Sequence, residues 1–186
     1  MSLLAIYPDS AEGQPEVIKD PTAIAAQLQN IGVQFEQWQA SQPLKDDADQ
    51  AAVMAAYQGS IDKLNSQYDF QLVDVVALRP DNPDKAEFRK KFLAEHTHAD
   101  FEVRFFVDGR GLFYLHVADK VYLVLCEKGD LISVPANTTH WFDMGKDPNF
   151  KCIRLFTTED GWVGDFTGSD IATRFPDFDQ TVAQFK

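Results

Sequence analysis

Apolar residues follow two different spacings along the chain, and the change between them lies near residue 70. In the first part they recur at helical spacing over residues 21–30 and again over roughly 47–68, which predicts two helices. Between these helices, residues 33–38 alternate between apolar and polar side chains, as a short strand would. The N-terminal part is therefore expected to be largely helical.

The pattern after residue 70 is mostly of period two. Residues 73–78 predict a strand, a short charged helix is expected over about 84–92, and a dense series of strands follows to about residue 157. Short strands at this spacing predict an antiparallel barrel or sandwich. After Gly161 we expect an irregular tail with at most a short helix near 169–174. Turn-forming residues separate the strands at 108–111, 118–120, 128–130 and 135–137.

The length of 186 residues predicts a single domain over residues 1–186, because domains usually hold ~100–200 residues. Within it, residues 1–69 are expected to form a helical and strand region packed on a barrel, residues 70–160 the barrel core, and residues 161–186 a C-terminal tail. With 45% hydrophobic residues, the chain has enough apolar surface to fold without disulfides or other staples.

The charge balance excludes two classes of partner. The chain holds 17 Lys and Arg against 29 Asp and Glu, a net charge of −12, and its densest basic run is only residues 89–91. A nucleic-acid binder needs a clustered basic face, so no nucleic-acid partner is expected. No apolar run approaches the ~20 residues that cross a bilayer, so no membrane partner is expected either.

The compartment is expected to be the cytoplasm. The N-terminus lacks a basic segment followed by a long apolar stretch, so it does not resemble a signal peptide. The two cysteines, Cys126 and Cys152, lie in apolar strand-like runs. Since one cysteine pair in a domain of this size is not a disulfide scaffold, we predict two buried free thiols.

Two histidines are spaced for metal binding in the strand-rich part. His96 and His98 lie two residues apart, so on a strand they point to the same face with Cα atoms ~6.6 Å apart. Glu102 would lie ~13 Å beyond His98 in an extended chain. For its carboxylate to reach the same ion, the chain must bend at residues 99–101, where we predict a bulge or tight turn. Asp100 could supplement Glu102 as a second carboxylate ligand.

A third imidazole can reach the same site. His140 follows a strand, a turn at residues 135–137 and a return strand, and such a hairpin could bring it back to the other two histidines. Imidazole and carboxylate ligands suit Fe(II), Ni(II), Zn(II) or Mn(II), and four ligands leave two octahedral positions open. Open positions favour catalysis over a structural metal. The fourth histidine, His116, is interpreted as an ordinary strand residue outside the site.

Two segments resemble the sequence motifs of the cupin barrels. The first covers residues 96–109 and the second residues 129–140, and the candidate ligands all fall on ligand positions of these motifs. Lys90, Asn137 and Met144 depart from the general cupin pattern.

A longer set of motifs resembles one cupin family, the acireductone dioxygenases of bacterial methionine salvage. The motifs are residues 95–98, 102–106, 124–128, 130–136, 140–145 and 166–168, with 32–38 and 56–64 in the N-terminal part. The resemblance covers nearly the whole chain, and departures such as Phe101 lie outside the ligand positions. It implies a mainly β fold with flanking α: a cupin-type antiparallel β-barrel, or jelly roll, with N-terminal helices.

The resemblance also implies an activity. A member of this family adds O2 to an acireductone, an ene-diol ketone. With Fe(II) the family gives formate and 4-methylthio-2-oxobutanoate, and with Ni(II) it gives formate, carbon monoxide and 3-methylthiopropanoate. Carried over to this chain, the ligands of one Fe(II), or alternatively Ni(II), are His96, His98, Glu102 and His140. The expected partners are acireductone and O2, and the protein is expected to be a monomer.

Four further residues are expected at the substrate. Arg104 lies two residues after Glu102 and should share its strand face, where its charge and forked donors can reach a substrate oxygen. We expect Arg104 to act in catalysis and in substrate binding. Phe142 lies at the same offset from His140. With Phe92 and Trp162 it is expected to form an apolar wall around the methylthio tail of the substrate.

Two alternatives share the same four ligands. The chain could be another cupin dioxygenase or isomerase that acts on a different ene-diol or phenolic substrate, and activity on catechols would then replace activity on acireductone. It could also be a non-catalytic cupin that senses or stores a small anion. The complete ligand set and the absence of a basic recognition face before residue 70 argue against this second alternative.

Overall fold

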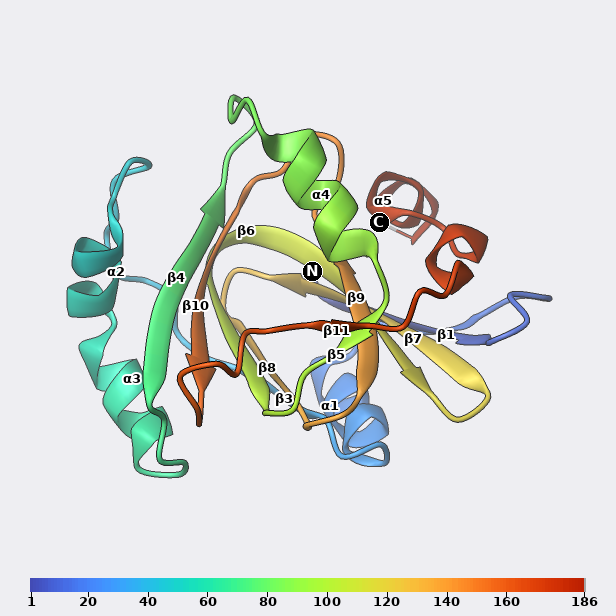
Figure 1. Ribbon diagram of the computed structural model, residues 1–186, viewed down its shortest axis with the longest axis horizontal. Coiled ribbons are helices and arrows are strands. Elements are labelled where there is room, and N and C mark those ends of the chain that lie inside the picture. The colour runs from blue at the N-terminus through green and yellow to red at the C-terminus, as the bar shows by residue number, and fades with distance from the viewer. Residues whose placement is uncertain (186) are drawn as a thin grey trace.

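The computed structural model describes residues 1–185 and shows antiparallel strands with helices packed outside them (Figure 1). The strands are β1 (Leu3–Pro8), β2 (Glu16–Ile18), β3 (Gln34–Gln37), β4 (Leu72–Leu78), β5 (His96–Thr97), β6 (Glu102–Val117), β7 (Lys120–Glu127), β8 (Asp130–Val134), β9 (Thr139–Asp143), β10 (Phe150–Phe156) and β11 (Asp165–Phe166). The helices are α1 (Pro21–Gln29), α2 (Gln50–Ala56), α3 (Gln58–Asn65), α4 (Lys85–Leu93), the 3-10 helix η1 (Ile171–Arg174) and α5 (Phe178–Phe185).

The long strand β6 belongs to two sheets and joins them. Its N-terminal half pairs with β8 and β10, and its C-terminal half pairs with β7 and β9. One sheet therefore has the order β11-β5-β9-β6-β7-β1-β2, and the other has the order β3-β8-β6-β10-β4. All of these pairings are antiparallel, which agrees with the expected jelly-roll arrangement.

A β-bulge allows β6 to serve both sheets. Its pairing register with β10 shifts at Val107, which is the extra residue. Gly109 follows with φ +66°, and a Cβ there would lie 1.9 Å from the carbonyl oxygen of Asn149, so only glycine fits. The turn expected at residues 108–111 is therefore wrong. The Asp and Gly signal at that place marks a bulge inside one continuous strand.

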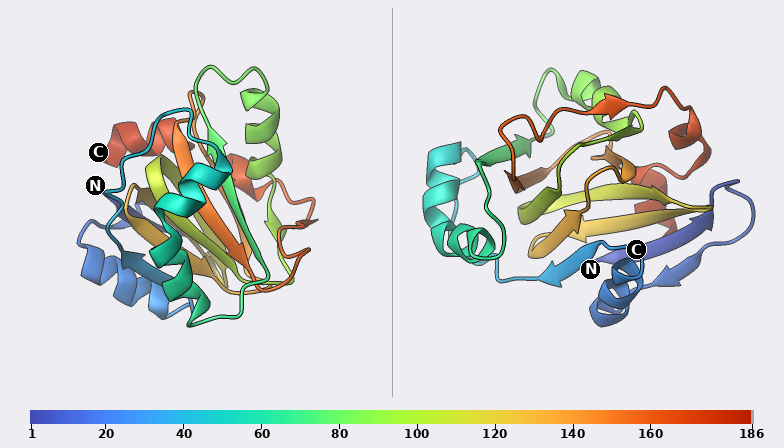
Figure 2. Two further views of the ribbon diagram at one scale, coloured as in Figure 1. Left: turned by 90° about the vertical axis from the view of Figure 1, so that its left-hand side faces the viewer. Right: turned by 60° about the horizontal axis from the view of Figure 1, so that its bottom comes forward.

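Three apolar cores result from these two sheets. The central core lies between them and contains Phe106 and Phe113, which share a face although they lie an odd number of residues apart, because the bulge intervenes. A second core lies between the other face of β6 and the helices α2 and α3, where Tyr57 meets Phe105 edge to face at 5.6 Å. A third lies under η1 and α5. Figure 2 shows these helix pairs on opposite outer sides of the molecule.

The helices and strands agree with several expectations and differ at both ends of the chain. The strands β1 and β2 are not expected from the sequence, and the tail after Gly161, expected to hold at most a short helix near 169–174, also forms β11 and the helix α5. The predicted elements at 21–30, 33–38, 73–78 and 84–92 are confirmed within one or two residues. The expected helix over 47–68 is two helices that meet at Tyr57. Both cysteines are buried free thiols, as predicted. No helix within residues 1–185 is long and apolar enough to cross a membrane.

Candidate metal centre and its cavity

The first two histidines come from β5 and the bend that follows it. His96 opens β5, and His98 lies just beyond its end. The chain then turns, as the sequence predicted, and re-enters a strand at Glu102. Asp100 fixes this turn, because its buried carboxylate accepts hydrogen bonds from the backbone N–H groups of Thr157 and Thr158 at 2.6 and 2.9 Å. Asp100 is thus occupied by the backbone after β10 and does not join the histidines.

The third histidine arrives on β9. His140 pairs directly with His96 across β9 and β5, so the strand register places their side chains together. The ring centroid of His140 lies 4.5 Å from that of His96 and 5.2 Å from that of His98. One nitrogen from each of the three buried rings lies within 4.8 Å of the others, a group that could hold a metal ion.

Each imidazole is oriented by its second nitrogen. Nδ1 of His96, His98 and His140 lies 2.7, 2.9 and 2.8 Å from the carbonyl oxygens of Ala94, Val163 and Thr138, respectively. A carbonyl oxygen only accepts, so Nδ1 carries the proton, and the lone pair of each neutral ring lies on Nε2. Hydrogen bonding of the outer nitrogen to a carbonyl is the usual arrangement around protein-bound metals.

Glu102 lies beside two of the three imidazoles, although it is not itself within 4.8 Å of all of them. Its Oε2 lies 3.0 Å from Nε2 of His140 and 3.7 Å from Nε2 of His98. With Nδ1 already donating to a carbonyl, Nε2 of a neutral His140 has a lone pair facing a carboxylate oxygen. Two acceptors at that distance require a cation or a shared proton between them. The residues present therefore fit a divalent metal ion.

The electrostatics of the group also favour a bound cation. Burial and, after it, the neighbouring His140 lower the pKa of His96 to about 4. Burial likewise lowers the pKa of His98. Burial opposes ionisation of Glu102, yet the Arg104 guanidinium and the close contact with the His140 ring hold the pKa of that carboxyl well below its usual range. Neutral imidazoles beside an ionised carboxylate form the donor set that Fe(II), Ni(II) and similar ions take.

Arg104 is held next to the group. Its Nε donates to Oε1 of Glu102 at 2.7 Å, and its Nη2 lies at the same distance from that oxygen. The guanidinium lies over the rings of Phe113 and Phe142, with its central carbon 4.9 and 4.6 Å from their centroids. Nη1 is buried and has no hydrogen-bond partner within the described part of the chain. An unused buried donor is costly unless a ligand accepts from it.

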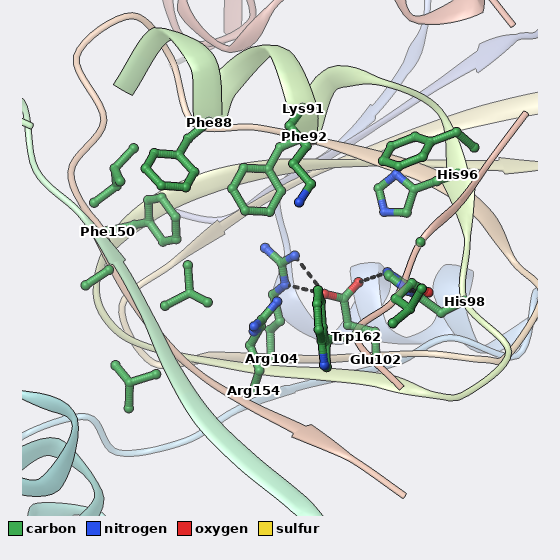
Figure 3. A pocket seen from close by; sticks show the side chains of 17 residues that line it. Phe88, Lys91, Phe92, His96, His98, Glu102, Arg104, Phe150, Arg154 and Trp162 are labelled. Carbon is green, nitrogen blue, oxygen red and sulfur yellow. Dashed lines mark hydrogen bonds and ion pairs between the residues drawn. The ribbon is translucent and has the colours of Figure 1, made fainter. Parts of the chain in front are cut away.

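A cavity of about 550 Å³ opens beside these residues (Figure 3). Its polar end is lined by His96, His98, Glu102 and Arg104. Its apolar end is formed by residues of β4, α4 and β10, namely Val75, Val76, Ala77, Leu78, Phe88, Phe92 and Phe150. The combination suits a small ligand with polar oxygens at one end and an apolar tail at the other.

The structure brings together most of the residues expected at the substrate. Phe92 and Trp162 line the cavity, and Trp162 is 49% exposed at its mouth. Phe142 is fully buried and is not among the lining residues; it lies behind Arg104 and meets Phe92 edge to face at 6.1 Å. Phe142 therefore supports the guanidinium and the Phe92 ring from behind.

Sequence reasoning missed several residues of the cavity. It assigned no role to the β4 residues, Phe88, Lys91 or Arg154, all of which line it. Arg154 forms two hydrogen bonds with Asp74, at 2.9 and 2.6 Å. The apolar pattern of β4 predicts a strand but does not indicate that the strand lines a cavity. One available signal was the helical spacing of Phe88, Lys91 and Phe92, which places them on one face of α4.

Residues 161–168, called the covering segment here, pass over the metal centre (Figure 1, β11). The strand β11 within it pairs with β5, and Phe166 lies opposite His96. The carbonyl oxygen of Val163 holds His98, and a Cβ on Gly164 would lie 3.2 Å from the His96 ring. The covering segment was expected to be irregular, but its backbone orients one candidate ligand and packs closely on another.

Comparison with known proteins agrees with this site. The model of the ARD/ARD' family matches residues 4–164. The chain is 60% identical over 176 residues to the acireductone dioxygenase of Methylococcus capsulatus, covering 95% of each chain. It is 57% identical over 182 residues to that of Aquifex aeolicus, covering 98% of this chain and 99% of the relative.

A solved structure is also similar. The acireductone dioxygenase from Bacillus anthracis, determined with a cadmium ion in its active center, superposes with a TM-score of 0.79 and is 31% identical, covering 89% of this chain and 98% of that one. The expected fold class is thereby confirmed. A metal cofactor in this chain is supported by that cadmium-bound relative together with the three-histidine group.

Proposed function

The chain belongs to the ARD/ARD' family, and we propose that it is an acireductone dioxygenase, an enzyme that joins O2 to an ene-diol ketone carrying a methylthio tail. The main support for the proposal is the group of three buried imidazoles with Glu102 beside them. This group lies at the polar end of a cavity whose other end is apolar. Such a cavity fits a small molecule with both oxygens and an apolar tail.

The proposed metal ligands are Nε2 of His96, His98 and His140 and the carboxylate of Glu102. The metal in the active enzyme is Fe(II), with Ni(II) as an alternative. A divalent ion bound by these residues would supply Lewis acidity that stabilises the negative charge of the ene-diolate. The carbonyl groups of Ala94, Thr138 and Val163 keep the three imidazoles in the required tautomer.

Arg104 is the proposed catalytic and substrate-binding residue. Two of its nitrogens bond to Glu102, which leaves the buried Nη1 as a donor for a substrate oxygen. Its charge stabilises the anion in a site from which Phe92 and Trp162 exclude water. Phe142 keeps the guanidinium in place from behind rather than touching the tail.

The reaction balances without a further oxidant. With Fe(II), the bond between C1 and C2 of the acireductone breaks, and both atoms of O2 appear in formate and 4-methylthio-2-oxobutanoate. With Ni(II), the bond between C2 and C3 breaks as well, and C2 leaves as carbon monoxide beside formate and 3-methylthiopropanoate. The first reaction places the enzyme in methionine salvage, where a 2-oxo acid is transaminated to an amino acid.

We also propose that the protein is a monomer and acts in the cytoplasm.

The test uses metal-free protein reconstituted separately with Fe(II) and Ni(II). Acireductone is added in aerated buffer, and O2 uptake, organic acids and carbon monoxide are measured. We expect uptake with both ions, the 2-oxo acid with Fe(II) and carbon monoxide with Ni(II). Identical products with both ions would refute the proposal that the bound metal determines the products. The absence of turnover with either ion would refute the proposed function itself. Catechol serves as a parallel substrate, and turnover of catechol alone would identify a different cupin dioxygenase.

A further inference from the structure

Lys91 is a cation on an otherwise apolar helix face. On α4, residues 88, 91 and 92 lie three and four positions apart and share a face, and all three line the cavity. Phe88 and Phe92 contribute aromatic surface, whereas Lys91 contributes an ammonium group. In Figure 3 its side chain projects from α4, and its nitrogen lies between the rings of Phe92 and His96. Burying apolar surface does not require a lysine at this position.

The other cations of the cavity wall already have carboxylate partners. Arg104 is paired with Glu102 and Arg154 with Asp74, at 2.7 and 2.6 Å. Among residues 1–185, no carboxylate lies within ion-pair distance of the Lys91 ammonium and no hydrogen bond is formed by it. Lys91 is thus the one lining cation of the described chain whose charge is not offset by a neighbouring side chain.

The helix that carries Lys91 is fixed in place. Arg89 forms two hydrogen bonds with the buried carboxylate of Asp143 on β9, at 2.7 and 2.8 Å. Lys85 at the start of the helix bonds to the carbonyl oxygen of Pro80 and to Asp147, both at 2.8 Å. Because α4 is held at its first residue and at its middle, the Cα of Lys91, two residues after Arg89, is fixed over the cavity while its long side chain remains free to reach a ligand.

We propose that Lys91 is a substrate-binding residue that pairs with the anionic oxygens of the substrate at the mouth of the cavity. The inference rests on the proposed function, because an acireductone reacts as an anion and the products are carboxylates. In a protein of net charge −12, the overall field repels such a ligand, so attraction must come from unpaired charge close to the site. Lys91 supplies that charge where an entering anion first leaves bulk water.

Lys90 provides a matched control. It precedes Lys91 on α4, carries the same charge and is exposed, but it faces away from the cavity and does not line it. Lys91→Met and Lys90→Met therefore change the net charge of the protein equally and differ only in where the charge is lost. Lys91→Arg keeps the charge and tests whether an ammonium is specifically required.

The first arm of the test measures turnover of the Fe(II)-loaded proteins at several salt concentrations. We expect Lys91→Met to lower kcat/KM about fivefold or more, chiefly through KM, and to reduce the loss of kcat/KM with added salt. Lys90→Met should stay within about twofold of the unchanged protein, and Lys91→Arg should recover most of the loss. Equal kinetics for Lys91→Met and Lys90→Met would overturn the proposal while leaving the function intact.

The second arm does not depend on turnover. Binding of 3-(methylthio)propanoate and of its uncharged amide to the metal-loaded proteins is measured by calorimetry. Lys91→Met should weaken binding of the carboxylate about fivefold and leave binding of the amide unchanged, whereas Lys90→Met should change neither. If the unchanged protein fails to turn over acireductone, the proposed function is refuted, and the role of Lys91 is then decided by the binding measurements alone. An equal loss for carboxylate and amide would show that Lys91 only shapes the cavity and would overturn the proposal.

Discussion

The hydroxyl of Thr167 donates a 2.7 Å hydrogen bond to the buried carboxylate of Glu95, the residue before the candidate ligand His96. The backbone N–H of Thr167 also donates to the Glu95 carbonyl oxygen, at 3.0 Å. These bonds fasten the end of the covering segment to the start of β5. The carbonyl of Val163 in the same segment orients His98. We therefore infer that the two hydrogen bonds between Thr167 and Glu95 also help to position this candidate ligand through the backbone.

Replacing Thr167 with valine tests this connection. The substitution replaces the hydroxyl, which also accepts from the Ser169 N–H at 3.2 Å, by a methyl group of similar size, so we expect the protein to remain folded. Its affinity for Ni(II) should fall about threefold to tenfold, less than the ~10- to 100-fold loss for groups bonded directly to a metal ligand, because Thr167 acts through the backbone. Hydrogen exchange in residues 161–168 should quicken. Thr173→Val is the control, because the Thr173 hydroxyl donates to the Asp170 carbonyl in η1. Equal metal affinities for both variants would contradict the connection.

Arg104→Gln is expected to lower kcat/KM by about 100-fold, because removing one charged donor aimed at a reacting oxygen has effects of that order. Metal content, measured in parallel, should remain near one ion per chain. Lys120→Gln, which removes an exposed lysine at the start of β7, is expected to change kcat/KM by less than about twofold. Similar losses for both variants would mean that overall charge, rather than the Arg104 donor, governs substrate use.

Asp143 joins α4, β9 and α5, and its loss is expected to destabilise the whole fold. Its carboxylate is fully buried and accepts from Arg89 and from the N–H groups of Gly145 and Phe178, at 3.0 and 2.8 Å. Asp143→Ala leaves the Arg89 guanidinium with only its longer contact to Asp177, at 3.5 Å, so the free energy of unfolding in urea should fall by ~3–5 kcal/mol.

The control for Asp143 is the exposed pair of Asp170 and Arg174. Asp170→Ala should change the free energy of unfolding by less than ~1 kcal/mol, because solvent screens that pair. A similarly small change for Asp143→Ala would refute the claim that this carboxylate holds the three elements together.

Asp130 is expected to make stability depend on pH. Burial raises its pKa to about 6, although hydrogen bonds from Ser2 and Gln37 act to lower it. A folded-state pKa above the ordinary value of 3.8 means that the folded protein binds this proton more tightly than the unfolded chain. The stabilisation is therefore fully present below about pH 4 and is lost as the pH rises through about 6.

The measurement compares urea unfolding of the unchanged protein and of Asp130→Asn at pH 4 and pH 7. The free energy of unfolding of the unchanged protein, relative to the variant, should fall by ~2–3 kcal/mol between these pH values. A constant difference would show that Asp130 does not titrate in this range.

Much of the metal centre could be predicted from sequence because its information is local. Two histidines two residues apart, and a carboxylate reachable through one bend, depend only on strand geometry. The bend at Asp100 follows from the same distances. The partners of the Nδ1 atoms could not be predicted, because Val163 is 65 residues away from His98 along the chain.

The parts of the fold that were missed depend on long-range pairing. The strand β1 has no alternation, since both of its faces are buried, one in the central core and the other under η1 and α5. The bulge at Val107 carries residues typical of a turn, and only its pairing with β10 shows that β6 continues. Lys91 could not be assigned to the cavity until α4 was placed over it.

We propose that His96, His98, Glu102 and His140 together hold one catalytic metal ion. Anomalous diffraction from crystals of the Ni(II)-loaded protein, collected on both sides of the nickel absorption edge, tests it most directly. We expect one nickel peak per chain, within bonding distance of Nε2 of the three imidazoles and of a Glu102 oxygen. A peak elsewhere, or a peak that Glu102 does not contact, would contradict it.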